Sequence, residues 1–76
     1  MTNLERLQKV ISTELQIDIE KVTQDAHLFD DLNFDSLDTV ETVIALENEF
    51  DIEIADDEID NVRTIQNILD LINDLA

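Results

Sequence analysis

The chain contains no cysteine, no glycine and no proline. Without cysteine, neither a disulfide nor a thiolate metal site can support the fold, so apolar side chains must do so. Without glycine and proline, the tight turns of a β-sandwich or barrel are difficult to form. Seventy-six residues, 43% of them hydrophobic, suffice for one small core. These absences favour an all-α fold in a single domain over residues 1–76.

Basic residues are nearly as scarce. Four Lys and Arg oppose 20 Asp and Glu, which gives a formal net charge of −16, and the stretch from Val22 to Val62 holds 14 acids and no Lys or Arg. Nucleic acid is excluded as a partner because phosphate contacts need basic side chains, and an anionic membrane surface is disfavoured for the same reason. Such a field attracts a basic patch on another protein.

Long apolar runs are also absent. No stretch of the sequence could span a bilayer, and the first ten residues lack the apolar core of a signal peptide. We therefore expect no membrane insertion and a cytoplasmic location, or an organellar matrix if the chain is a processed form.

Apolar residues recur at helical spacing in four segments. The predicted helices are three main ones over residues 3–15, 36–50 and 64–75, and a short third one over about 56–61. Thr2 or Asn3 is expected to cap the first, Asp35 or Ser36 to begin the second, and Thr64 to cap the last. The pattern predicts a small four-helix bundle.

Two connecting segments lack this period. Residues 16–35 carry enough apolar side chains to pack as a long ordered loop, with one helical turn near residues 21–24. Residues 51–54, "DIEI", alternate like a strand but have no evident partner, so an extended connection that buries Ile52 or Ile54 is expected. Ile59 and Val62 should point inward from the short helix.

Ser36 lies between acids at the head of the second predicted helix. Serine and aspartate are both favoured N-caps, so spacing alone favours a simple cap. A helix N-terminus also offers free amides and partial positive charge, which would suit a phosphodiester on Ser36. Catalysis by Ser36 is disfavoured because His27 is the only histidine and no oriented base is evident. We therefore expect a cap or an attachment point, and not an enzyme.

The segment "DSLDTVETVIALENEFDIEIADDEI" resembles the acyl carrier proteins, which carry Asp-Ser-Leu at the start of their second helix. The resemblance runs from "LERLQKVISTEL" to "IQNILDLI", essentially the whole chain. It implies that Ser36 bears 4′-phosphopantetheine, transferred from coenzyme A by a holo-carrier-protein synthase (a phosphopantetheinyl transferase). It also implies that the arm carries acyl groups as thioesters between enzymes of fatty-acid synthesis.

The resemblance further implies a docking face for partner enzymes with basic patches and an apolar pocket for the acyl chain. The docking face would comprise Asp35, Leu37, Asp38, Val40, Glu41, Ile44, Glu47, Asp56 and Asp57. The acyl-chain pocket would comprise Leu28, Phe29, Leu46, Phe50, Ile54, Val62 and Ile68. Each pocket residue is equally explained as ordinary core, and all three phenylalanines are expected to be core.

Four positions depart from the family pattern, one of which, Asn48, slightly thins the row of acids. Asn33 replaces a common glycine, and asparagine tolerates positive φ better than other non-glycine residues. Ala55 replaces a common proline before the short helix, which should loosen its start. Thr42 replaces an aliphatic residue and is expected at the edge of the apolar stripe.

Other functions fit the sequence less well. Asp31, Asn33 and Asp35 match the first ligand positions of a calcium-binding EF-hand loop, but Ser36 stands where glycine is required and Thr42 replaces the bidentate glutamate. No dedicated metal site is therefore expected. Carriers of polyketide, aminoacyl or D-alanyl groups share the fold, and an arm-less acidic interaction module is a further alternative. The strong self-repulsion of the chain favours a monomer.

Overall fold

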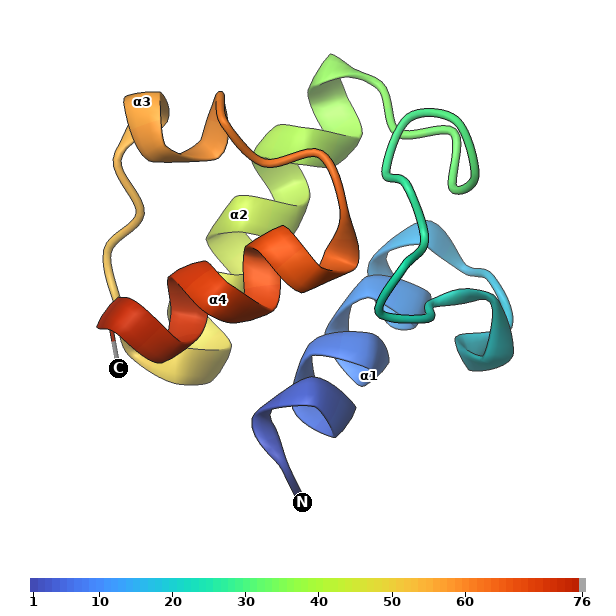
Figure 1. Ribbon diagram of the computed structural model, residues 1–76, viewed down its shortest axis with the longest axis horizontal. Coiled ribbons are helices and arrows are strands. Elements are labelled where there is room, and N and C mark those ends of the chain that lie inside the picture. Colours follow the sequence, from blue (N-terminus) through green and yellow to red (C-terminus); the bar gives the residue numbers. More distant parts are fainter. Residues whose placement is uncertain (76) are drawn as a thin grey trace.

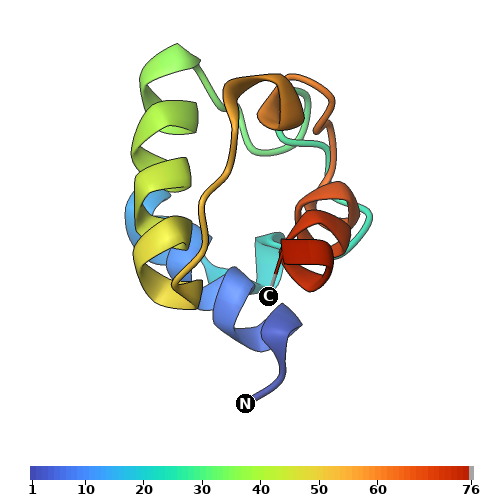
Figure 2. The ribbon, with the colours of Figure 1, turned by 90° about the vertical axis from the view of Figure 1, so that its left-hand side faces the viewer.

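Four α-helices and one 3₁₀ turn form the regular structure of residues 1–75, the part of the chain that the computed structural model describes. They are α1 (Asn3–Leu15), η1 (Ile19–Lys21), α2 (Ser36–Phe50), α3 (Asp56–Ile59) and α4 (Ile65–Leu75). Figures 1 and 2 show α3 and the start of α2 at one end of the molecule, with α1 near the opposite end. The predicted four-helix bundle with a short third helix is confirmed.

Side-chain caps begin the helices where the sequence predicts. At α1 the Glu5 amide donates to the Thr2 hydroxyl (3.1 Å) and the Thr2 amide donates to the Glu5 carboxylate (3.0 Å). These hydrogen bonds from Thr2 hold the pKa of the Glu5 carboxyl below its usual range. At α4 the Asn67 amide donates to the Thr64 hydroxyl (3.2 Å) and the Thr64 amide donates to the Asn67 side-chain oxygen (3.1 Å). Both predicted caps are confirmed.

The two short elements differ from their predicted bounds. The helical turn, expected near residues 21–24, lies at η1, because Val22 is fully buried and leaves helical geometry (φ −92°, ψ 70°). Helix α3 ends at Ile59, since the next amides, of Asn61 and Val62, bond to carbonyls only three residues back. No side chain caps α3 at Ala55.

The core lies between α1, α2 and α4. Its fully buried side chains are Leu7, Ile11, Val22, Leu46, Ile65, Ile68 and Ile72. Residues 51–54 form the expected extended connection, which buries Ile54 and leaves Ile52 half-buried. Val62 is buried and Ile59 is half-buried against the core, so both point inward as predicted.

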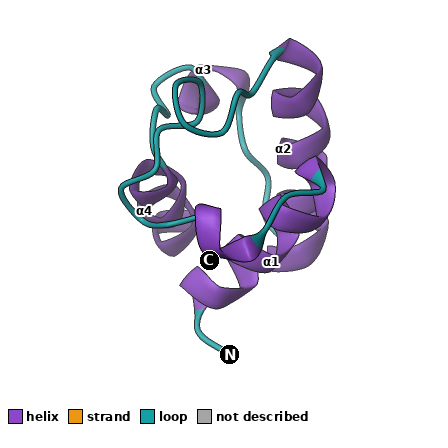
Figure 3. Cartoon of the chain, turned by 90° about the vertical axis from the view of Figure 1, so that its right-hand side faces the viewer, coloured by secondary structure: helices purple, strands orange, loops and turns teal. Residues whose placement is uncertain are grey.

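The long loop over residues 16–35 is held to the segment that precedes α4. The Leu28 amide donates to the Arg63 carbonyl (2.9 Å), and the Ile65 amide donates to the Ala26 carbonyl (3.1 Å). These bonds flank an isolated antiparallel bridge between His27 and Thr64. In Figure 3 the loop is part of the teal trace that connects α1 to α2. The loop is therefore ordered, and its position fixes where α2 begins.

Three non-glycine residues adopt left-handed backbone conformations: Gln16, Asn33 and Asp51. Gln16 and Asp51 end α1 and α2, each with φ 55°, a position that most proteins give to glycine. Asn33 (φ 58°) confirms that asparagine can replace glycine before α2. Because the chain has no glycine, it pays a steric cost at each of these sites.

Replacing the exposed Gln16 by glycine should therefore stabilise the protein by about 1 kcal/mol, since glycine adopts this conformation without strain. Urea unfolding followed by far-ultraviolet circular dichroism measures the effect, because the chain has no Trp or Tyr. Gln16→Ala is the control and should not stabilise. A glycine variant less stable than the parent would contradict this account of the α1 end.

Candidate functional site

Asp35, and not Ser36, caps α2. The Asp38 amide donates to Asp35 Oδ1 (2.8 Å), and the Asp35 amide donates to Asp38 Oδ2 (3.3 Å). Ser36 is the first helical residue, its side chain is exposed, and no hydrogen bond within residues 1–75 engages its hydroxyl. The segment "DSLD" therefore does form a cap, but Asp35 and not Ser36 supplies it.

The other serine of the chain provides a comparison. The Ser12 hydroxyl donates to the Lys9 carbonyl (3.0 Å) within α1. At the head of α2 the hydroxyl of Ser36 is free, and the amides of Ser36 and Leu37 bond to no acceptor within the described residues. A free hydroxyl beside free amides at a helix N-terminus can accommodate a phosphodiester without displacing any contact. The residues present therefore fit a 4′-phosphopantetheine group.

Buried side chains immediately before α2 fix the position of this site. Leu32 and Phe34 are both 7% exposed, and the Phe34 amide donates to the Leu28 carbonyl (3.0 Å). With the loop anchored on both sides of Asn33, the short segment that leads into α2 has a defined path. Ser36 is consequently presented at the surface by a rigid element.

The carboxylates of the possible calcium loop are used by the backbone. Asp31 accepts from the His27 amide (2.7 Å), and Asp35 is occupied by the α2 cap. Within residues 1–75, no group of three or more His, Cys, Asp or Glu side chains is arranged to hold a metal ion. His27 accepts from the Asp30 amide through Nδ1 (3.3 Å), a role within the loop.

Helix α2 exposes an apolar stripe that begins beside Ser36. Leu37 is 64% exposed, Val40 57% and Ile44 54%. They are spaced three and four residues apart and so share one face of the helix. Acids were predicted to accompany this stripe. The exposed ones are the cap residue Asp35, Glu41 on α2, and Asp56 and Asp57 on α3, whereas Asp38 is partly exposed. Helix α3 and the start of α2 lie at the same end of the molecule (Figures 1 and 2).

Glu47 differs from the other acids of the predicted docking face. Its side chain is half-buried, and Oε2 accepts from the Ile54 amide (2.8 Å). The carboxylate thus holds the extended connection against α2. Glu47 serves the fold first, and its charge is less available to a partner than that of Glu41.

A small cavity of about 20 Å³ lies beneath the N-terminal half of α2. It is lined by Leu28, Phe29, Phe34, Thr39, Thr42, Val43, Leu46, Ile59, Val62 and Ile68. Five of the seven predicted acyl-chain residues therefore meet here. Phe50 and Ile54 do not line it, since Phe50 packs under the Arg6 guanidinium (4.4 Å) at the far end of α2 and Ile54 is held in the extended connection.

Two residues of this cavity differ in burial from what the sequence predicts. Phe29 is 43% exposed at the rim and is not core, because it lies in a loop that directs its ring outward. Thr42 is 2% exposed and lies in the interior, where its hydroxyl has no hydrogen-bond partner. Its spacing of three residues from Thr39 and four from Leu46 was the signal that could have placed it inward.

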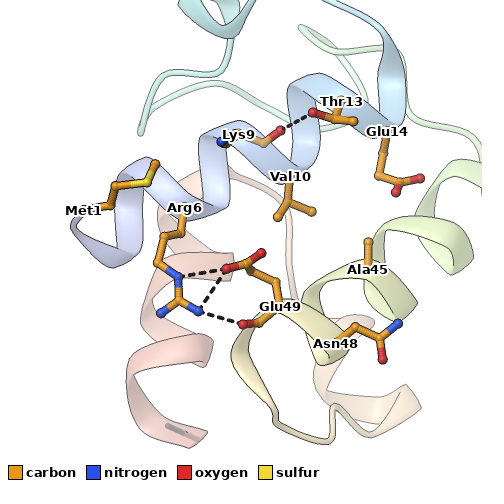
Figure 4. A pocket seen from close by; sticks show the side chains of 9 residues that line it. All are labelled: Met1, Arg6, Lys9, Val10, Thr13, Glu14, Ala45, Asn48 and Glu49. Carbon is orange, nitrogen blue, oxygen red and sulfur yellow. Dashed lines mark hydrogen bonds and ion pairs between the residues drawn. The ribbon is translucent and has the colours of Figure 1, made fainter.

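A larger hollow than this cavity lies between α1 and α2. A groove of about 450 Å³ separates α1 from the C-terminal half of α2 and is lined by residues that include Arg6, Ala45 and Glu49 (Figure 4). There Arg6 forms an ion pair with Glu49 (3.0 Å) and also bonds to the Glu49 carbonyl (2.6 Å). Ala45 follows Ser36 by nine residues, roughly 14 Å along the helix axis. The groove is therefore a joint between helices and not part of the Ser36 site.

Comparison with known proteins agrees with this geometry. Residues 5–72 match the family model described as the phosphopantetheine attachment site. The chain is 51% identical over 73 residues to an acyl carrier protein of Buchnera aphidicola, covering 95% of this chain and 91% of the relative. It is 46% identical over 70 residues to an acyl carrier protein of Thermosynechococcus vestitus, covering 92% of this chain and 86% of that relative. A solved structure from Mycobacterium tuberculosis, provisionally assigned as an acyl carrier protein, matches with a TM-score of 0.80 at 34% identity over 86% of each chain.

The chain belongs to the acyl carrier proteins, the family that carries a phosphopantetheine attachment site. Members hold 4′-phosphopantetheine covalently, act as carriers and not as enzymes, and interact with a phosphopantetheinyl transferase and with enzymes that use the carried acyl group. None of the helices in the described part of the chain combines the length and apolarity that a membrane crossing requires.

Thr42→Val should stabilise the unmodified protein by about 1 kcal/mol, because it removes a buried, unpaired hydroxyl without changing the side-chain shape. Urea unfolding measures the change. The control is Thr39→Val. The Thr39 hydroxyl donates to the Asp35 carbonyl (3.0 Å), so its removal should not stabilise the protein. Destabilisation by Thr42→Val would show that the hydroxyl has a favourable partner in the native protein.

Proposed function

We propose that Ser36 is the residue that bears the 4′-phosphopantetheine arm. The observation that carries this assignment is the free, exposed hydroxyl at the head of α2, inside the matched family segment, whereas the hydroxyl of Ser12 is bonded within α1. Asp35 holds the helix start and leaves the serine oxygen available. When bound, the arm supplies a terminal thiol on which acyl groups are held as thioesters.

The pathway we infer is fatty-acid synthesis in the cytoplasm. The likeness to named acyl carrier proteins over more than nine-tenths of the chain supports this inference, as does an α2 dense in acids. The match over residues 5–72 supports a single carrier domain, and the net charge of −16 opposes self-association, which supports a monomer.

The exposed stripe of Leu37, Val40 and Ile44 is the docking face in this proposal. An apolar stripe flanked by acids complements a partner with an apolar contact surrounded by Lys and Arg. Charge steers the encounter, and the small apolar contact keeps each complex short-lived. Such kinetics suit a carrier that must visit several enzymes in succession.

Incubation with coenzyme A and a broad-specificity phosphopantetheinyl transferase should add one arm to the parent protein and none to Ser36→Ala. Intact mass measures the gain. Ser12→Ala is the matched control, since it removes the only other serine and should be modified like the parent. Modification of Ser36→Ala, or none of the folded parent, would contradict the assignment.

Glu41→Lys should lower kcat/KM of the transferase by about tenfold at low ionic strength, and the difference should shrink as salt is added. Glu41 is exposed on the docking face and makes no hydrogen bond within residues 1–75, so the change alters charge without loss of a contact. The matched control is Asp74→Lys, the same charge change on α4. Equal effects of both variants would mean that net charge, and not this face, governs recognition.

A further inference from the structure

Thr42 is the one buried side chain within residues 1–75 whose polar atom has no partner. The residue is 2% exposed and lines the cavity beneath α2, whose other polar lining residue is Thr39. A threonine in a helix ordinarily satisfies its hydroxyl with the carbonyl four residues back. Thr39 does so with Asp35 (3.0 Å), whereas Thr42 makes no such bond. An unpaired buried hydroxyl is costly, so its presence in a cavity indicates a ligand atom.

The cavity is suited to an oxygen carried on an otherwise apolar chain. Its remaining lining consists of aliphatic and aromatic side chains, which pack favourably against a hydrocarbon chain. At about 20 Å³ the cavity admits a single water at most, and a water here would have few polar neighbours to bond. An acyl chain would enter by displacing the apolar lining side chains. A fully reduced acyl chain would leave the Thr42 hydroxyl unpaired, whereas a chain with a hydroxyl or carbonyl oxygen would pair with it.

The position of Thr42 along α2 specifies where on the acyl chain that oxygen should be. Thr39, Thr42 and Leu46 follow Ser36 by three, six and ten residues, roughly 4, 9 and 15 Å along the helix axis. The rim is formed by the residues of the cavity that solvent reaches, Phe29 and, in part, Thr39, Val43 and Ile59. A chain that enters from the Ser36 end therefore passes Thr42 before Leu46, so its thioester end lies nearer Thr42.

We propose that Thr42 is a specificity-determining residue that makes this carrier favour acyl groups with an oxygen on the third carbon over fully reduced groups of the same length. The Thr42 hydroxyl donates a hydrogen bond to that oxygen and can accept one from a 3-hydroxyl. The proposal rests on attachment of the arm at Ser36. It predicts that the interior of the carrier distinguishes early, oxygenated intermediates from the reduced product.

The test compares three acyl arms on the same protein: hexanoyl, 3-hydroxyhexanoyl and 6-hydroxyhexanoyl. Each is installed from the corresponding acyl-coenzyme A by a broad-specificity transferase and verified by intact mass. The thermal midpoint of each loaded form is then measured by circular dichroism. In the parent protein the 3-hydroxyhexanoyl form should melt above the hexanoyl form by roughly 4–8 °C, the shift that one net hydrogen bond produces in a small domain. The 6-hydroxyhexanoyl form should show no such gain.

Two variants test whether the Thr42 hydroxyl itself produces the difference in thermal midpoint. In Thr42→Val the advantage of the 3-hydroxyhexanoyl arm should vanish, whereas Thr39→Val, which removes an already bonded hydroxyl from the same cavity, should retain it. Equal midpoints for the hexanoyl and 3-hydroxyhexanoyl forms of the parent would overturn the proposal, and so would an advantage that persists in Thr42→Val. An equal gain from the 6-hydroxyl would overturn the placement of the oxygen. Failure to gain the acyl arm at all would instead overturn attachment at Ser36, and this inference with it.

Discussion

The reciprocal hydrogen bonds between Asp35 and Asp38 are the interaction on which the site depends. An aspartate at the N-cap satisfies the helix amide that a serine there would otherwise satisfy. It also brings negative charge to the positive end of the α2 dipole, where an acid is stabilising. Because these bonds define the first turn, the next residue, Ser36, enters the helix with its hydroxyl unused. One aspartate therefore starts the helix and leaves the Ser36 hydroxyl free, as the proposed modification requires.

Negative charge is the second constraint, and it destabilises the folded chain. Acids on α2 and α3 repel one another, and the glycine-free chain adds strain at Gln16, Asn33 and Asp51. Compensation comes from a continuous apolar core and from a few long-range bonds, such as those of the loop to Arg63 and of Arg6 to Glu49. In the proposed function, the acids that lower stability form the surface that basic partners recognise.

The sequence predicted the helices well because periodicity and caps are local signals. The starts of α1, α2 and α4 follow from residues within one turn, and the apolar spacing gives their faces. The stripe of Leu37, Val40 and Ile44 came from the family resemblance, and the structure shows that it is exposed within residues 1–75. Attachment at Ser36 came from the family pattern, since spacing alone favoured a cap.

The failures share a different cause, since each depends on how distant segments meet. Phe29 lies in a loop without a period, so nothing local shows that its ring faces solvent. The sequence predicts Glu47 as a surface acid, but the connection after α2 brings the Ile54 amide into hydrogen-bond contact with its carboxylate. Thr42 was placed at the helix edge because of its polarity, but its position on α2 buries it.

The most direct test of the account exchanges the two residues at the head of α2. In the double variant Asp35→Ser, Ser36→Asp, composition and charge are unchanged, and serine remains an acceptable cap. We expect helix content and thermal midpoint close to those of the parent, but no gain of phosphopantetheine by intact mass, because the serine hydroxyl is then engaged in the cap. Modification at the rate of the parent would contradict the claim that the aspartate cap makes Ser36 available.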